Sequence, residues 1–87
     1  MLYRNAADKA FLAMILAVNS YIKRRLGVVA RTHSKRRSLL RKLDREDLRA
    51  RYSDVMRTLH EGIYNPDEAK YAIEVVERTL KELKGQR

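Results

Sequence analysis

Glycine and proline, the residues that interrupt helices, are scarce in this chain and lie far apart. The 87 residues contain three glycines and one proline. Long stretches without either residue favour a mostly helical fold, because other side chains tolerate a helix interior better. Gly27, Gly62 and Gly85 are placed to end helices, and Asn65 followed by Pro66 is typical of a helix start.

Apolar residues recur every three or four positions in four segments, which is the spacing of one helical face. The pattern predicts an all-α fold, a small up-and-down bundle of about four helices in a single domain spanning residues 1–87. Asp44 is expected to cap the third helix, since Glu46 and Asp47 would follow in its first turn. We expect helices at residues 5–25, at 32–42 or 34–42, and at 66–84, with a third helix that follows Asp44 and has His60 in its last turn before Gly62.

The first of these segments is apolar around most of its circumference. A helix of this kind is buried on several sides, and a chain of this length has little core with which to cover it. The segment therefore predicts self-association as a dimer, in which a second copy covers one side of the helix. The expected interface residues are Phe11, Ala13, Met14 and Ala17.

Positive charge is concentrated in the first half of the chain. Residues 1–43 hold eleven lysines and arginines and one acidic residue, whereas residues 44–87 hold nine basic and ten acidic residues. The first half therefore accounts for the formal net charge of +9. Such asymmetry predicts a polyanion or an acidic protein as partner. The alternative is a solvated face of mobile arginines.

The start of the second helix carries a candidate anion site. Lys35, Arg36 and Arg37 lie in its expected first turn, where positive charge opposes the helix dipole. A bound phosphate would offset that conflict, because helix N-terminal N–H groups and arginine side chains both suit it. We expect these three residues and Arg41 to bind an anion. The alternative is that the helix begins later, near Ser38, and leaves a basic loop.

Arg57 and His60 are a candidate catalytic pair on the expected third helix. Arg57 and His60 are three residues apart, hence neighbours on one helix face. Arginine stabilises charge on a phosphate and histidine transfers protons near neutral pH, which suits metal-free RNA cleavage. The alternative is structural, because a histidine in the last turn of a helix binds its unpaired carbonyls. We favour this structural interpretation over a catalytic one.

Other classes of site have no support in the sequence. The chain has no cysteine and only His33 and His60 as histidines, so we expect neither a metal site nor a cofactor. Its most apolar run covers residues 10–18, which is far shorter than the roughly 20 residues that span a bilayer. We therefore expect a cytoplasmic protein that does not bind membranes.

Three segments together resemble archaeal members of the HEPN-like domain family. They are residues 8–18, Asp-Lys-Ala-Phe-Leu-Ala-Met-Ile-Leu-Ala-Val; a basic middle with His33 and residues 37–40, Arg-Ser-Leu-Leu; and residues 59–64, Leu-His-Glu-Gly-Ile-Tyr. The resemblance covers residues 7–83. It implies a helical bundle that dimerises, and either RNA cleavage or partnership with nucleotidyltransferases in toxin–antitoxin systems.

The active-site motif of the HEPN family is an arginine, then four to six residues, then a histidine. Here two residues separate Arg57 from His60, and eight separate Arg51 from His60. The sequence therefore predicts a small basic binding module, a homodimer that contacts RNA or an acidic protein. Two alternatives stay open, a toxin-like HEPN ribonuclease using Arg57 and His60, and a structural or antitoxin-like protein partner that docks through its first helix.

Overall fold

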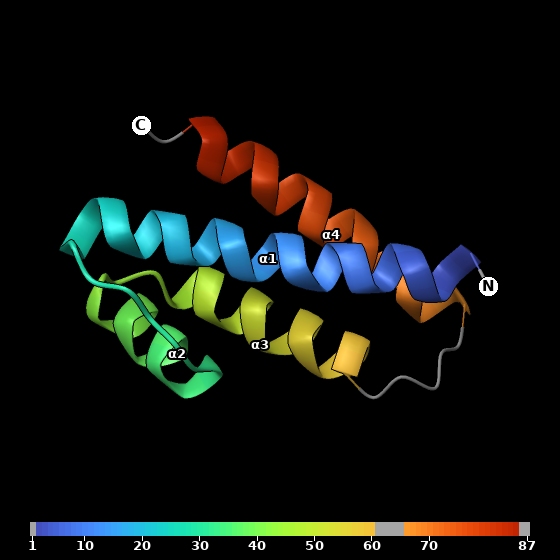
Figure 1. The fold of residues 1–87 in the computed structure, drawn as a ribbon, viewed down its shortest axis with the longest axis horizontal. Coiled ribbons are helices and arrows are strands. Elements are labelled where there is room, and N and C mark those ends of the chain that lie inside the picture. Colours follow the sequence, from blue (N-terminus) through green and yellow to red (C-terminus); the bar gives the residue numbers. More distant parts are fainter. Residues whose placement is uncertain (1, 61–65, 86–87) are drawn as a thin grey trace.

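Three long helices and one short helix build the fold (Figure 1). The computed structural model describes residues 2–60 and 66–85, with the side chains of 2–5, His60 and Pro66 outside the description. The helices within these residues are α1 (Leu2–Leu26), α2 (His33–Lys42), α3 (Glu46–His60) and α4 (Pro66–Gly85). The prediction of an all-α fold with four helices is confirmed for this part of the chain.

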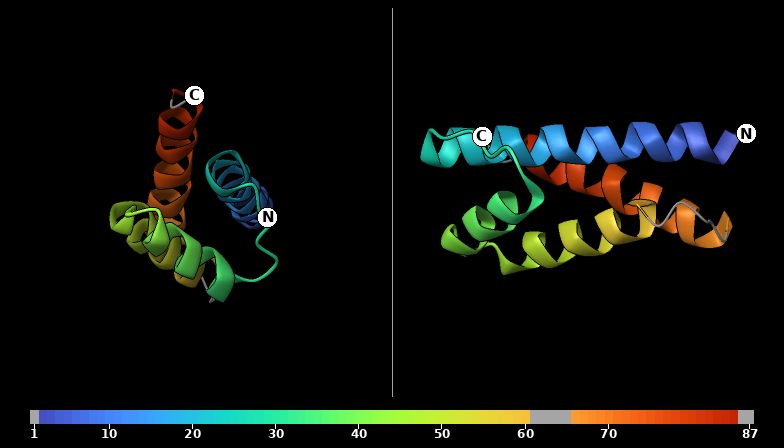
Figure 2. Two further views of the ribbon diagram at one scale, coloured as in Figure 1. Left: turned by 90° about the vertical axis from the view of Figure 1, so that its left-hand side faces the viewer. Right: turned by 60° about the horizontal axis from the view of Figure 1, so that its bottom comes forward.

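Helix α1 lies at the centre of the arrangement. It packs against each of the other three helices, while α3 packs against α2 and α4. The chain reverses direction from α1 to α3 and again from α3 to α4, and the short α2 lies beside α3 at one end of the molecule (Figures 1 and 2). The radius of gyration is 12.7 Å. A folded domain of this length is expected to have a value of about 12 Å.

The core is built from one face of each helix. Tyr52 of α3 is the largest side chain that is fully buried, and Met14, Ile22, Leu40 and Leu48 surround the same interior. On α4 the buried face includes Ala72, Val75 and Val76. The outer face of α1 stays open, with Leu12 and Leu16 exposed at 57% and 55%.

The predicted end of α1 is confirmed, and α2 begins between the two predicted positions, at His33; both boundaries have local causes. Gly27 ends α1 with a φ of 70°, a left-handed conformation that glycine adopts without steric cost. Thr32 caps α2, and its side chain accepts a hydrogen bond from the Lys35 backbone N–H at 3.0 Å. The later start of this helix near Ser38, which the sequence left open, is therefore wrong.

The turn between α2 and α3 corrects the prediction that Asp44 caps α3. Asp44 has a φ of 60° and follows the α2 C-cap, Leu43. Its backbone N–H donates to the Arg41 carbonyl at 3.0 Å, and the Arg45 N–H donates to the Leu40 carbonyl at 2.9 Å. This pair of bonds is the Schellman arrangement that ends a helix. Asp44 therefore closes α2 instead of opening α3.

The predicted stop at Gly62 and the cap at Asn65 lie outside the described residues. Pro66 is the first residue of α4, as expected for proline. None of the helices in the described ranges is both long and apolar enough to cross a membrane.

Candidate functional site

Eight basic side chains gather on the elements at one end of the molecule. They come from the last turn of α1, the connection after it, and α2, which lie together at the left of Figure 1. All are exposed except Arg37, which is half-buried. We call this set the basic surface; it consists of Lys23, Arg24, Arg25, Arg31, Lys35, Arg37, Arg41 and Lys42.

The basic surface has no direct ion pair with the acidic residues that the structure describes, although Arg41 is close enough to Glu46 to help lower the pKa of that carboxyl group. Two of the basic side chains contact neutral groups, since Arg24 donates to the Leu83 carbonyl at 3.5 Å and the Arg25 guanidinium lies 5.4 Å from the Tyr21 ring centroid. Positive charge on this surface is therefore available to an external anion.

The arginines of α3 and its N-cap behave differently, because each described one has a carboxylate partner. Arg45 pairs with Asp47 at 3.1 Å, and Arg49 pairs with Glu46. These contacts lower the pKa of both carboxyl groups below their usual range. The remaining pairs are Arg51 with Glu82 at 2.7 Å and Arg57 with Asp54 at 2.7 Å. The ion pairs of the described residues thus lie outside the basic surface.

Arg36 does not belong to the basic surface, which corrects its predicted place in a solvated anion site. It is 7% exposed, because it lies on the same face of α2 as the core residues Leu39 and Leu40. Its Nε donates to Asn19 Oδ1 at 2.7 Å. Its two terminal nitrogens donate to the Tyr52 hydroxyl and to the Ala30 carbonyl, both at 3.4 Å.

Arg36 therefore connects α2 to α1, to α3 and to the segment between α1 and α2. All its partners are neutral, so its charge is buried without a carboxylate. A charged group removed from water is costly unless hydrogen bonds replace its hydration, and the three bonds supply that replacement. The residue acts within the fold and is not placed to contact an external anion.

Tyr52 extends this network to His33. Its hydroxyl lies 2.6 Å from His33 Nδ1. The Arg36 guanidinium can only donate, so the Tyr52 oxygen accepts there and its own hydrogen is available to His33 Nδ1. Burial raises the pKa of Tyr52, although Arg36 opposes the shift, so the phenol stays neutral as a donor. Phe11 also packs on the histidine, edge to face, at 6.0 Å between ring centroids.

His33 stands at the edge of a groove between α1, α2 and α3. The groove has a volume of about 220 Å³. Arg37 comes from α2, one turn after His33, and Arg57 comes from α3, one turn after Ser53. We call it the His33 groove; its lining residues are Phe11, His33, Arg37, Ser53, Met56 and Arg57.

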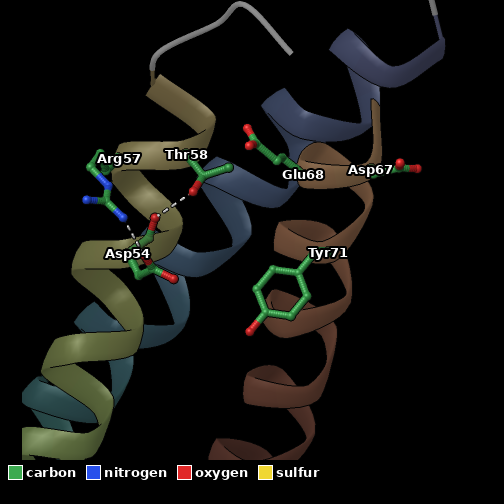
Figure 3. Close-up of a pocket in the computed structure, with 6 residues that line it drawn as sticks. All are labelled: Asp54, Arg57, Thr58, Asp67, Glu68 and Tyr71. Atoms are coloured by element: carbon green, nitrogen blue, oxygen red, sulfur yellow. Dashed lines mark hydrogen bonds and ion pairs between the residues drawn. The ribbon is translucent and has the colours of Figure 1, made fainter. Parts of the chain in front are cut away.

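A second, larger groove between α3 and α4 has the opposite character (Figure 3). Its volume is about 550 Å³, and three of its six lining residues are acidic. The Arg57–Asp54 pair lies at one wall, where the Thr58 hydroxyl also donates to the Asp54 carbonyl at 3.0 Å. No group of side chains in the described ranges has a metal-binding arrangement. The lining residues are Asp54, Arg57, Thr58, Asp67, Glu68 and Tyr71.

The predicted catalytic pair of Arg57 and His60 stays a prediction, because the His60 side chain lies outside the description. Arg57 lines one groove together with His33 and Arg37. Lys35 and Arg41, predicted to share an anion site with Arg37, are exposed parts of the basic surface and do not line the His33 groove.

The predicted interface on α1 needs one correction. Met14 has no exposed surface because it packs into the core of its own chain. Phe11, Ala13 and Ala17 are partly buried against that core. The large apolar side chains that α1 leaves exposed are Leu12 and Leu16.

The sequence analysis missed His33 as a site residue, although a signal was present. Because Thr32 caps α2, both His33 and Arg37 belong to the helix. They are four residues apart and therefore lie on one helical face. Ser53 and Arg57 have the same spacing on α3. Each pair marks a polar stripe, but only the packing of α2 on α3 brings the two stripes to one groove.

Comparison with known proteins identifies no relative. No protein-family model, curated protein or solved structure matches this chain.

Proposed function

We propose that this chain is a small basic helical module that binds RNA through its basic surface. The observation that carries the proposal is the charge distribution in the fold, because the eight side chains of that surface form no ion pair with a described residue. Unpaired lysines and arginines on one surface attract a phosphate backbone and release its counterions. The resemblance to HEPN-like families supports RNA as the polyanion.

We further propose that the module is a homodimer that uses the outer face of α1. Leu12 and Leu16 stand one helical turn apart and are more than half exposed. Removing them from water would favour association. The partly buried Ala13 and Ala17 lie near them on the same helix, whereas Phe11 lines the His33 groove. A dimer would also place two basic surfaces in one particle, which increases the effective affinity for a long strand.

The RNA-binding proposal is tested by two triple variants with the same change in net charge. The first, Arg31→Glu with Arg41→Glu and Lys42→Glu, alters the basic surface. The control, Arg78→Glu with Lys81→Glu and Lys84→Glu, alters exposed positions on α4.

We expect the first variant to weaken binding of a structured RNA by roughly 100-fold at low salt, and the control to weaken it far less. If both triple variants lose the same RNA affinity, net charge alone determines binding, and the proposal that the basic surface is the binding site is contradicted. Absence of RNA binding by the wild-type chain, together with tight binding of an acidic protein, would replace RNA by a protein partner.

A further inference from the structure

The His33 groove combines positive charge with apolar walls. Two guanidinium groups and one imidazole line it, and none of its six lining residues is acidic. Phe11 and Met56 supply apolar surface beside the charged groups. This composition differs from that of the α3–α4 groove, where three carboxylates would repel an anion. The His33 groove therefore selects for an anionic ligand that also has a flat or apolar part.

Both arginines are able to turn toward such a ligand. Arg37 makes no ion pair with a described residue, and it is only half-buried. Arg57 is paired with Asp54, but both side chains of that pair are more than half exposed. Exposed pairs contribute little free energy, so a phosphate group, whether the singly charged diester of a strand or the terminal group of a mononucleotide, can compete for Arg57. Asp54 itself does not line the His33 groove.

The histidine side of the groove is held in place before any ligand arrives. Tyr52 contacts His33 Nδ1 at 2.6 Å, and the buried Arg36 in turn holds Tyr52. Phe11 packs on the histidine at nearly a right angle, 87° between the ring planes. A wall that is already ordered loses little conformational entropy on binding. His33 is exposed, so this ordered side chain is accessible to a ligand in the groove.

We propose that the His33 groove is a nucleotide subsite that binds one phosphate group between Arg37 and Arg57. Arginine suits this role because its planar group binds phosphate oxygens in pairs. The sugar and base lie against Phe11 and Met56, where an aromatic ring offers a stacking surface of the kind that single strands use. The inference rests on the proposed RNA-binding function, and the phosphate belongs either to a strand or to a free mononucleotide.

Calorimetry with three probes tests the subsite, namely inorganic phosphate, uridine monophosphate and a single-stranded RNA of eight uridines. The variants are Arg37→Gln and Arg57→Gln, with the exposed α4 residue in Arg78→Gln as the matched control. Thermal unfolding of each variant verifies the fold. We expect Arg37→Gln and Arg57→Gln each to weaken binding of the uridine probes roughly tenfold or more, and Arg78→Gln to leave it unchanged.

A fourth variant, Phe11→Leu, separates the aromatic contact from the phosphate contact. It keeps an apolar side chain at the position, so the packing of α1 is retained. We expect it to weaken uridine monophosphate binding severalfold while leaving inorganic phosphate unaffected. An equal effect on both probes would contradict the stacking role assigned to Phe11.

The outcomes separate the subsite from the wider function. If the octamer binds and responds to Arg31→Glu and Arg41→Glu but not to Arg37→Gln or Arg57→Gln, the subsite is wrong and the basic surface stands. If uridine monophosphate binds through Arg37 and Arg57 while RNA does not bind, the subsite stands for a free nucleotide and the RNA-binding proposal fails. Binding of the octamer alone, weakened by both glutamine variants, assigns the groove to a strand phosphate.

Discussion

At the scale of single residues, Asp44 occupies a conformation that suits glycine better. Its φ of 60° closes α2, and a residue with a Cβ pays roughly 1 kcal/mol or more in that region. We expect Asp44→Gly to raise the free energy of unfolding by about 0.5–1 kcal/mol, because the steric relief exceeds the added entropy of the unfolded chain. Urea unfolding measures it.

Ala50→Gly is the matched control for that change. Ala50 is exposed within α3, where glycine costs about 1 kcal/mol. If Asp44→Gly raises the free energy of unfolding while Ala50→Gly lowers it, the left-handed conformation of Asp44 is confirmed. If both variants lower it, that conformation is contradicted.

Arg36 and Arg41 have the same side chain and the same helix but different surroundings. Arg36→Ala removes three hydrogen bonds, including those to the half-buried Asn19 side chain and to the buried Ala30 carbonyl. We expect it to lower the free energy of unfolding by about 2–4 kcal/mol. The exposed Arg41→Ala should change it by less than about 0.5 kcal/mol. If urea unfolding gives similar losses of unfolding free energy for Arg36→Ala and Arg41→Ala, the buried position of Arg36 is contradicted.

At the scale of helices, Tyr52 joins α3 to α2 through His33 and Arg36. Tyr52→Phe keeps the ring and removes the hydroxyl, which takes one hydrogen bond from His33 and one from Arg36. We expect it to destabilise the fold by about 1–3 kcal/mol. Tyr71→Phe is the control, since Tyr71 is 59% exposed and should have almost no effect. Thermal unfolding that fails to distinguish the two variants would show that the network carries no stability.

The same hydroxyl makes stability depend on alkaline pH. Burial raises the pKa of Tyr52 in the folded chain, while the unfolded chain keeps a value of about 10. The contribution of this group is therefore complete below about pH 10 and is lost as the pH rises through the folded-state pKa. We expect Tyr52→Phe to lose less stability than wild type between about pH 9 and 11. If the free energy of unfolding falls equally with pH in wild type and in Tyr52→Phe, the raised pKa of Tyr52 is contradicted.

Helix boundaries were predictable where a local signal sets them. Gly27 ends α1 and Thr32 caps α2, because glycine tolerates a positive φ and a threonine hydroxyl accepts a backbone N–H. Asp44 misled the prediction, since aspartate suits an N-cap and also tolerates the left-handed region. Only the hydrogen bonds to Arg41 and Leu40 decide between these two roles.

At the scale of the whole molecule, packing decides what local pattern cannot. Arg36 is one of several basic residues in the same stretch, and the sequence of α2 alone does not predict that Asn19 and Tyr52 accept hydrogen bonds from it. Met14 is one apolar residue among many on α1, and the positions of α3 and α4 determine that it faces inward. The His33 groove likewise exists only because α2 docks on α3, which joins residues that are distant along the chain.

The exposed face of α1 predicts the oligomeric state. We expect light scattering at tens of micromolar to give a mass near twice 10.2 kDa. Leu12→Glu combined with Leu16→Glu should give a folded monomer, because charge on a packed apolar interface is costly and both positions are exposed within one chain. A wild-type monomer under these conditions would contradict the dimer.

If the basic surface binds the RNA backbone, the affinity must fall as salt is added, because bound phosphates release their counterions. The affinity of the wild-type chain for a single-stranded RNA is measured by fluorescence anisotropy over a series of salt concentrations. Each neutralised phosphate contributes about −0.7 to the slope of log K against log salt concentration on single strands. Engagement of four or more of the eight side chains predicts a slope of about −3 or steeper. A slope near zero, or no binding at low salt, would contradict the account.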